Sequence, residues 1–199
     1  MTSKFFRTAL PVAAVLVVAG IGGGAWLYLN GSFGESQPGG IGGPFTLTNG
    51  AGQTVTDRDL RGRYLLVYFG YTFCPDVCPT TLNDVAAALE ILGPKADRVQ
   101  PLFITVDPAR DTPNVVGEYT AAFSPRILGL SGTPEQIAAV AREYRVYFML
   151  NKPAKPGGDY TVDHSSILYL MDTSGRFIAP VRADQPPAQM AAEIARHLT

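Results

Sequence analysis

Two cysteines separated by three residues are the part of this chain best suited to chemistry. Cys74 and Cys78 are its only cysteines, and they stand in the segment YTFCPDVCP between a strand-like run and a helix-like run. A cysteine at the start of a helix is favoured as the thiolate, because the helix N-terminus offers N–H donors and a positive dipole end. Thiolates are soft metal ligands and redox-active nucleophiles. The pair could therefore hold a metal, exchange electrons, or close a structural disulfide.

The spacing of the pair favours chemistry over a structural bridge. Residues four positions apart on a helical turn project from one face, so both sulfurs can reach a single ion about 2.3 Å from each. Dithiol oxidoreductases typically have only two residues between their cysteines. A disulfide is within reach if the turn adjusts. It would close so short a loop that its entropic contribution to stability would be small.

His164 could supply a third ligand. It is one of two histidines, and it stands in YTVDHSS, after a loop and at the start of a predicted strand. Loops at strand ends converge on the crevice of an open α/β sheet, which would bring the imidazole over the cysteine turn. Two thiolates and one imidazole suit Cu(I) or Zn(II), and could take Cu(II) with an added ligand. Taken alone, however, this histidine is better interpreted as a surface or core histidine satisfied by the backbone.

Three other polar residues are weaker candidates for the same site. Asp163, beside His164, could orient the imidazole, or it could simply start the strand. Asp76, between the cysteines, could tune the thiolate charge or face a partner, and a solvated turn carboxylate explains it as well. His197 lies in the last turn of the predicted terminal helix, where a surface role that complements the helix dipole is favoured.

Two further groups are expected to be structural. Charged residues of the motif VDPARDTP are interpreted first as turn and ion-pair residues; they are Asp107, Arg110 and Asp111. The scattered methionines in apolar surroundings favour core packing over a thioether copper site; they are Met149, Met171 and Met190.

The elements that must position these residues alternate between strands and helices. The turn NGAG between 45–48 and 53–55 predicts a hairpin, and the continuous apolar run 64–69 is typical of a buried central strand. Helical spacing then continues from the cysteines to a Gly93-Pro94 stop. The remaining predictions are a strand over 99–106, helices opened by Thr112 and Thr133, a loop or hairpin inserted over 147–160, a hairpin of 166–171 with 176–180, and a helix over 187–198. This order predicts an α/β, thioredoxin-like fold, with a central mixed sheet flanked by helices.

The N-terminal segment predicts a membrane anchor. Lys4 and Arg7 precede the uncharged apolar run 9–29, which has the roughly 20 residues needed to cross a bilayer. The positive flank should stay cytoplasmic, so the rest of the chain should be extracytoplasmic, and periplasmic in a bacterium. A cleaved signal peptide is the alternative, although no convincing cleavage site follows the run. We therefore divide the chain into a flank and anchor at 1–30, a flexible Gly-rich tether at 31–43 and one domain at 44–199.

Charge excludes nucleic acid as a partner. Of the 16 Lys and Arg residues, two precede residue 30, whereas all 17 Asp and Glu residues follow it. The exported part is therefore mildly acidic and has no basic run of five or more, which makes it a poor nucleic-acid ligand. An oxidising compartment also permits a disulfide between the two cysteines.

Three motifs in order resemble the Sco/SenC family of membrane-anchored copper proteins. They are GYTFCPDVCPTTL at 70–82, VDPARDTP at 106–113 and DHSS at 163–166, and the resemblance runs from about Phe45 to the C-terminus. It implies a thioredoxin-like domain that binds one copper ion through Cys74, Cys78 and His164. It also implies a role in assembling the dinuclear copper site of cytochrome c oxidase subunit II. The implied partners are subunit II or another copper protein as target, and a copper donor protein.

The same motifs allow two tasks. A metallochaperone would hold Cu(I), and could hold Cu(II), and would release it by ligand exchange with the target's own thiolates and histidines. A thiol:disulfide reductase would attack a partner disulfide with Cys74 and resolve the mixed disulfide with Cys78, and His164 would then matter less. A peroxiredoxin-like peroxidase is a more distant alternative, because it gives that histidine no required part.

Overall fold

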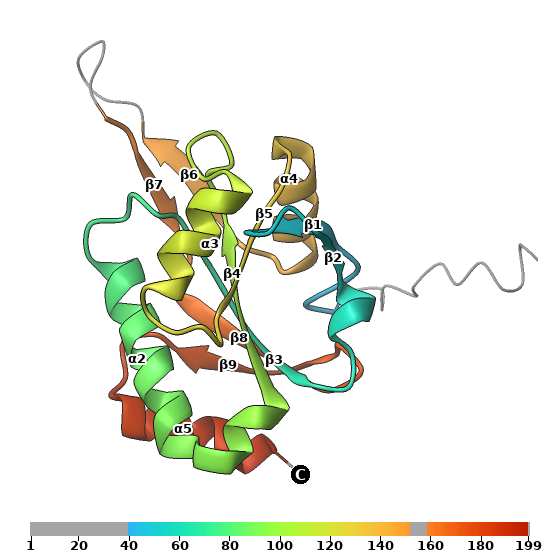
Figure 1. Ribbon diagram of the computed structural model, residues 1–199, viewed down its shortest axis with the longest axis vertical. Helices are drawn as coiled ribbons and strands as arrows, with labels where there is room; N and C mark the ends of the chain where they lie inside the picture. The colour runs from blue at the N-terminus through green and yellow to red at the C-terminus, as the bar shows by residue number, and fades with distance from the viewer. Residues whose placement is uncertain (1–39, 152–158, 199) are drawn as a thin grey trace, which may run out of the picture. The chain divides into compact units, whose positions relative to one another are not determined.

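A seven-stranded mixed sheet forms the centre of the computed structural model, which describes residues 40–151 and 159–198 (Figure 1). The strands are β1 (Thr46–Asn49), β2 (Thr54–Thr56), β3 (Tyr64–Gly70), β4 (Val99–Thr105), β5 (Leu128–Ser131), β8 (Ile167–Met171) and β9 (Phe177–Arg182). Their order across the sheet is β2-β1-β5-β4-β3-β8-β9. β4 pairs in parallel with both β3 and β5, and the other pairs are antiparallel.

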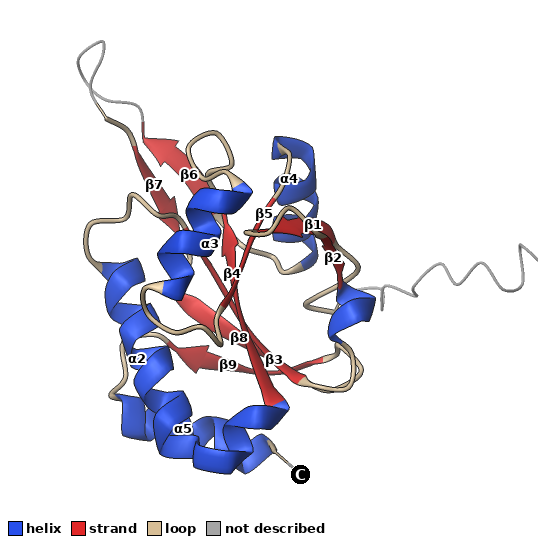
Figure 2. Cartoon of the chain, in the orientation of Figure 1, coloured by secondary structure: helices blue, strands red, loops and turns tan. Residues whose placement is uncertain are grey.

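Within the described residues, four α-helices and two short 3-10 helices surround this sheet (Figure 2). They are α2 (Val77–Leu92), α3 (Pro113–Ala121), α4 (Pro134–Glu143), α5 (Pro187–His197), η1 (Asp57–Leu60) and η2 (Gly93–Arg98). Helix α2 packs against α5, α3 against β5, and α4 against β1. Every residue of β3 and β4 is buried, as expected for central parallel strands that are covered on both faces. The predicted thioredoxin-like order of strands and helices is thus confirmed.

Helix ends follow the predicted capping residues. The side chains of Thr112 and Thr133 accept hydrogen bonds from backbone N–H groups in the first turns of α3 and α4. Gly93 follows α2 with a φ of 56°, which glycine adopts without the cost that a side chain would incur. Because α2 begins at Val77, Cys78 lies in its first turn.

One strand of the sheet was missed by the sequence analysis. β5 is only four residues long and contains Gly129, so it carries neither the length nor the β-branched residues of a strand signal. Helix α3 leaves no room for a side chain at Gly129, because a Cβ there would lie 2.7 Å from the Thr120 hydroxyl and from the Val116 carbonyl oxygen of α3. Close packing of α3 on β5 therefore requires a residue that weakens the strand pattern.

The segment inserted over 147–160 forms one arm of a separate hairpin. β6 (Phe148–Asn151) and β7 (Thr161–His164) pair antiparallel as a two-stranded sheet; residues 152–158 are not described. Met149, for which core packing was expected, is 47% exposed on this hairpin. That expectation was wrong for Met149 because β6 lies outside the main sheet, whereas Met171 and Met190 are fully buried.

The predicted anchor lies outside the described residues. Within residues 40–151 and 159–198, no helix has both the length and the apolar character needed to span a bilayer. The last residues that we assigned to the tether contact the domain, because Ile41 packs against the core and the Gly42 N–H donates to the Glu143 carbonyl oxygen at 2.8 Å.

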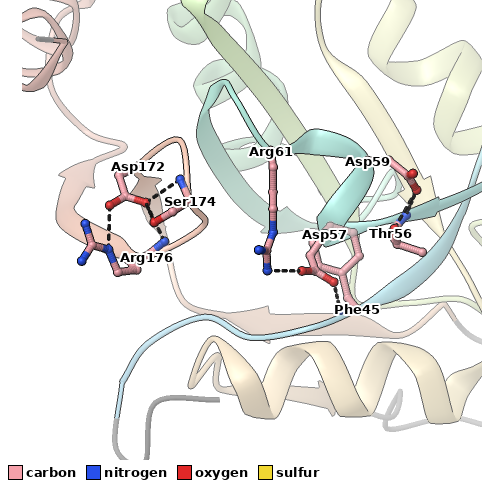
Figure 3. Close-up of polar contacts among 8 residues, drawn as sticks. All are labelled: Phe45, Thr56, Asp57, Asp59, Arg61, Asp172, Ser174 and Arg176. Carbon is pink, nitrogen blue, oxygen red and sulfur yellow. Dashed lines mark hydrogen bonds and ion pairs between the residues drawn. The ribbon is translucent and has the colours of Figure 1, made fainter. Parts of the chain in front are cut away.

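Polar side chains fix two turns by local hydrogen bonds (Figure 3). In the β8–β9 turn, the carboxylate of Asp172 accepts from the backbone N–H and the hydroxyl of Ser174, and from the backbone N–H and Nε of Arg176. At the start of η1, Asp59 accepts from the Thr56 backbone N–H and hydroxyl, which completes a capping box. We call the β8–β9 turn, with Asp172, Ser174 and Arg176, the Asp172 turn.

Candidate metal centre

The two cysteines lie where β3 passes into α2. Cys78, in the first turn of α2, is completely buried, and Cys74, in the preceding loop, is partly exposed. β3 ends at Gly70, and a Cβ there would lie 2.8 Å from both the Cys78 sulfur and the Phe103 ring. Glycine is therefore needed at the end of the strand to leave room for the buried sulfur.

The environment makes the two thiols unequal. The Cys78 backbone N–H donates to the Cys74 sulfur at 3.3 Å. Hydrogen bonds from the Cys78 side chain and from the Cys78 and Asp76 backbone, together with His164, lower the pKa of Cys74 to about 5, although burial opposes this shift. The hydrogen bond to Cys74 and burial raise the pKa of Cys78. The thiolate form expected for both cysteines at a helix N-terminus is thus favoured for Cys74, whereas for Cys78 the expectation was wrong, because its sulfur is buried and donates to Cys74.

His164, the last residue of β7, points its ring at Cys78. Its Nε2 lies 3.3 Å from the Cys78 sulfur, and its Nδ1 lies 3.2 Å from the Ser165 carbonyl oxygen. Because a carbonyl oxygen only accepts hydrogen bonds, the contact with Ser165 assigns a proton to Nδ1, which leaves Nε2 as the ring nitrogen placed to bind a metal beside the sulfur. Two rings, Tyr68 and Tyr71, meet the imidazole edge-on, with centroids 6.0 Å and 5.9 Å away.

Cys74, Cys78 and His164 therefore converge on one point. Their ligand atoms all lie within 4.8 Å of one another, and the group includes no other residue of the described chain. Two donors bonded to the same ion at about 2.0–2.3 Å lie at most about 4.6 Å apart, so small movements would suffice to bind a metal. Two sulfurs and a neutral imidazole nitrogen suit Cu(I) or Zn(II). Neither Cys74 nor Cys78 is part of a disulfide in the structure.

Tyr68 also contacts the site, which the sequence analysis missed. Its hydroxyl donates to the Cys78 sulfur at 3.8 Å. Burial and the neighbouring Cys78 raise the pKa of Tyr68, so the hydroxyl keeps its proton. Tyr68 lies inside the continuous apolar run of β3, where it resembles any core residue. The signal that could have found it is chemical, because a buried tyrosine hydroxyl needs a hydrogen-bond partner.

The other candidates lie differently. Asp76 and Asp163 are exposed, and the orienting position that we considered for Asp163 is taken by the Ser165 carbonyl oxygen on His164 Nδ1. His197 lies at the end of α5, in the last turn as expected, and it is not a member of the converging group.

Asp111 ties the cysteine loop to the neighbouring loop. Its side chain is completely buried and accepts from the Thr72 backbone N–H at 2.9 Å and from the Thr72 hydroxyl at 2.6 Å. It also accepts from the Thr105 hydroxyl at 2.6 Å. The motif VDPARDTP, expected to form a turn, therefore also holds the loop that carries Cys74.

Comparison with known proteins places these features in one family. Residues 34–199 match the family described as SCO1/SenC. Protein SenC of Rhodobacter capsulatus is 48% identical over 151 residues, which are 76% of this chain and 67% of that protein. Protein SCO1, mitochondrial, of Saccharomyces cerevisiae is 46% identical over 139 residues, 69% of this chain and 47% of that protein. This chain thus spans about half the length of the yeast relative.

A solved structure matches the fold as well as the sequence. The structure of Bradyrhizobium japonicum ScoI with copper bound has a TM-score of 0.72 and 47% sequence identity. The match covers 78% of this chain and 98% of that one.

Proposed function

This chain belongs to the SCO1/SenC family, and from that premise we propose that it is a copper metallochaperone. The observation that carries the proposal is the convergence of three soft ligands, one of them 86 residues distant in sequence from its neighbour Cys78. The copper-bound structure of the Bradyrhizobium relative supports copper rather than zinc. Copper is the cargo, and Cys74, Cys78 and His164 are its ligands.

Each ligand has a defined part in holding and releasing the cargo. Cys78 and the Nε2 of His164 form the buried side of the site, and Cys74 forms the side that is open to a partner. Transfer would begin at the open side, where a ligand of the target can replace the Cys74 thiolate. Cu(I) binds thiolates of either protein with similar strength, so replacing the Cys74 thiolate by a thiolate of the target changes the binding free energy little.

The surface beside the open ligand suits contact with another protein. Phe73 precedes Cys74 and Val77 precedes Cys78, and the two residues are 59% and 43% exposed. Exposed apolar side chains that lie together, aromatic ones above all, are typical of interfaces. We infer that the target docks there. The motif resemblance indicates the dinuclear copper site of cytochrome c oxidase subunit II as that target, with a separate copper donor protein. A membrane anchor at residues 9–29 would hold the domain on the extracytoplasmic side.

The test is a Cu(I) titration of the full chain under reducing conditions. The wild type should bind one ion, and Cys74→Ser, Cys78→Ser and His164→Ala should each weaken binding by at least tenfold, since each removes one of three bonds to the metal. His197→Ala is the matched control, because it removes a histidine outside the site. Undiminished affinity in His164→Ala would contradict a three-ligand site.

A thiol:disulfide reductase is the second candidate, and the unequal thiols favour it specifically. Cys74 is partly exposed with a pKa of about 5, and Cys78 beside it keeps its proton, which is the arrangement of an attacking and a resolving thiol. Reduction of a disulfide peptide that carries the cysteines of a copper-site target distinguishes the two candidates. Activity that survives His164→Ala and is lost in Cys74→Ser would favour the reductase over the chaperone.

A further inference from the structure

Arg110 lies between the two segments that carry the ligands. It belongs to the loop between β4 and α3, and its guanidinium is stacked on the ring of Tyr160, with Cζ 3.6 Å from the ring centroid. Cζ is also 4.8 Å from the centroid of Phe73 and 5.8 Å from that of Tyr71. Tyr71 and Phe73 belong to the cysteine loop, and Tyr160 leads directly into β7, which ends at His164.

Hydrogen bonds reinforce the contact with the β7 segment. Arg110 Nη1 donates to the Tyr160 carbonyl oxygen at 3.0 Å, and Nε donates to the Asp107 carboxylate. The other oxygen of Asp107 accepts from the Tyr160 hydroxyl at 2.8 Å. Asp107 and Arg110 therefore hold both the backbone and the side chain of Tyr160, 50 or more residues away in sequence.

The β6–β7 hairpin is separate from the main sheet. Among the described strands, β6 and β7 pair only with each other, so backbone hydrogen bonds of the main sheet do not fix them over the cysteines. Figure 1 shows the hairpin beside the loop that leads from β3 to α2. Val162 of β7 is buried in the core and holds the hairpin to the domain. A further link between hairpin and cysteine loop would reduce the part of the binding free energy that is spent on ordering His164 against the two sulfurs.

We propose that Arg110 is a positioning residue that couples the hairpin carrying His164 to the cysteine loop, so that the imidazole is held at the two sulfurs before a metal arrives. The expected consequence is a higher copper affinity, and this part of the inference rests on the proposed function. Its structural part, the coupling of hairpin to loop, stands on the contacts of Arg110 alone.

The chemistry of the contacts explains why the residue is arginine. A planar guanidinium can stack on aromatic rings with its faces while its edge donates to Asp107 and to the Tyr160 carbonyl oxygen. An ammonium group is compact and has no planar face, so lysine cannot make both sets of contacts at once. Arg110 Nη2 is buried and has no hydrogen-bond partner among the described residues.

The first test needs no metal. Amide hydrogen exchange and NMR contacts between the His164 and Tyr71 rings are measured on the full metal-free chain as wild type, Arg110→Ala, Arg110→Lys and Arg126→Ala. Arg110→Ala should speed exchange in β7 by at least tenfold and weaken the ring contact, leaving β3 and β4 protected, and Arg110→Lys should restore only part of the effect. Arg126→Ala is the matched control, since Arg126 pairs with Asp97 on an exposed surface and should change neither signal.

The second test is a double-mutant cycle in Cu(I) affinity. Arg110→Ala should weaken binding by about tenfold, the lower range for a residue that orients a metal ligand. In the His164→Ala background the same change should have no further effect, because Arg110 acts through the imidazole. Protection of β7 unchanged in Arg110→Ala, or equal losses of affinity in both backgrounds, would overturn the proposal. Failure of the wild type to bind copper would instead refute the proposed function, and hydrogen exchange would still decide on the coupling.

Discussion

The side chains of Asp111 and Asp172 each accept several hydrogen bonds, but the donors of the two residues lie at very different separations in the sequence. Asp111 accepts three hydrogen bonds from Thr72 and Thr105, which lie 39 and 6 residues away. Asp172 accepts four from Ser174 and Arg176, which lie 2 and 4 residues away (Figure 3). The first carboxylate is completely buried and the second is partly exposed.

The difference shows how a polar network acquires a functional role. The Asp172 turn needs only its own short segment, so it stabilises a hairpin and reaches nothing else. Asp111 can be satisfied only if two loops from different strands meet, and one of these loops carries Cys74. Burial also raises the cost of losing a partner, because the groups left behind have no water to bind. Four changes test this contrast.

Asp111→Ala should have the largest effect. It leaves the Thr72 N–H and two hydroxyls without their acceptor at a buried position, which should lower the free energy of unfolding by about 3 kcal/mol. Copper affinity should fall too, because the cysteine loop loses its anchor. Urea denaturation of the metal-free chain and a Cu(I) titration measure the two effects. If Asp111→Ala lowered the free energy of unfolding no more than Asp172→Ala does, then neither burial nor the sequence separation of the donors would distinguish the two networks.

Gly70→Ala should rank second. Its Cβ would lie 2.8 Å from the Cys78 sulfur and from the Phe103 ring, and overpacking of this kind typically costs about 1–3 kcal/mol. Because the sulfur must move, copper affinity should fall along with stability. Gly175→Ala in the Asp172 turn is the control: its φ is 81° with open space around it, so it should cost about 1 kcal/mol in backbone strain and leave copper binding unchanged.

Thr72→Val should have a smaller effect on the Asp111 network. It removes the hydroxyl that donates to Asp111 at 2.6 Å but keeps the shape of the side chain and the backbone N–H bond. Thermal unfolding should show a loss of about 1 kcal/mol. Ser174→Ala removes the corresponding hydroxyl bond to Asp172, and its loss should be smaller because water can replace the bond. Equal losses in the two variants would contradict the role of burial.

Asp172→Ala should have the smallest effect, about 1 kcal/mol or less, and should not change copper affinity. Burial opposes ionisation of Asp172, but hydrogen bonds from Ser174 and Arg176 outweigh it and lower its pKa from 3.8 to about 2. A lowered pKa stabilises the folded state above the unfolded value, and this contribution disappears as the pH falls from about 4 to about 2.

The pH dependence of unfolding checks this sign. Wild-type stability should rise with pH between about 2 and 4, and Asp172→Ala should flatten that slope. Asp97→Ala is the control, since Asp97 also pairs with an arginine on the surface. An unchanged slope in Asp172→Ala would show that the turn does not hold the ionised carboxylate.

Much of the fold could be predicted because its signals are local. The apolar run of β3, the threonine caps of α3 and α4 and the glycine after α2 each depend on a few adjacent residues. β5 escaped because its one distinctive residue, Gly129, is chosen by contact with α3 rather than by strand propensity. Met149 was misplaced for a related reason, since an apolar residue on a two-stranded hairpin looks like one in a core.

The candidate site divides in the same way. Cys74 and Cys78 are four residues apart at the start of α2, so their proximity follows from the sequence, whereas the low pKa of Cys74 also depends on His164. The sequence also named His164, through its place at a strand end and through a family resemblance. Tertiary structure alone decided that its Nε2 faces Cys78, that Tyr68 reaches the same sulfur, and that Arg110 joins the two ligand segments. The reason is physical: helical turns and caps are set by neighbouring residues, whereas contacts across 50 or more residues exist only once the core has packed the segments together.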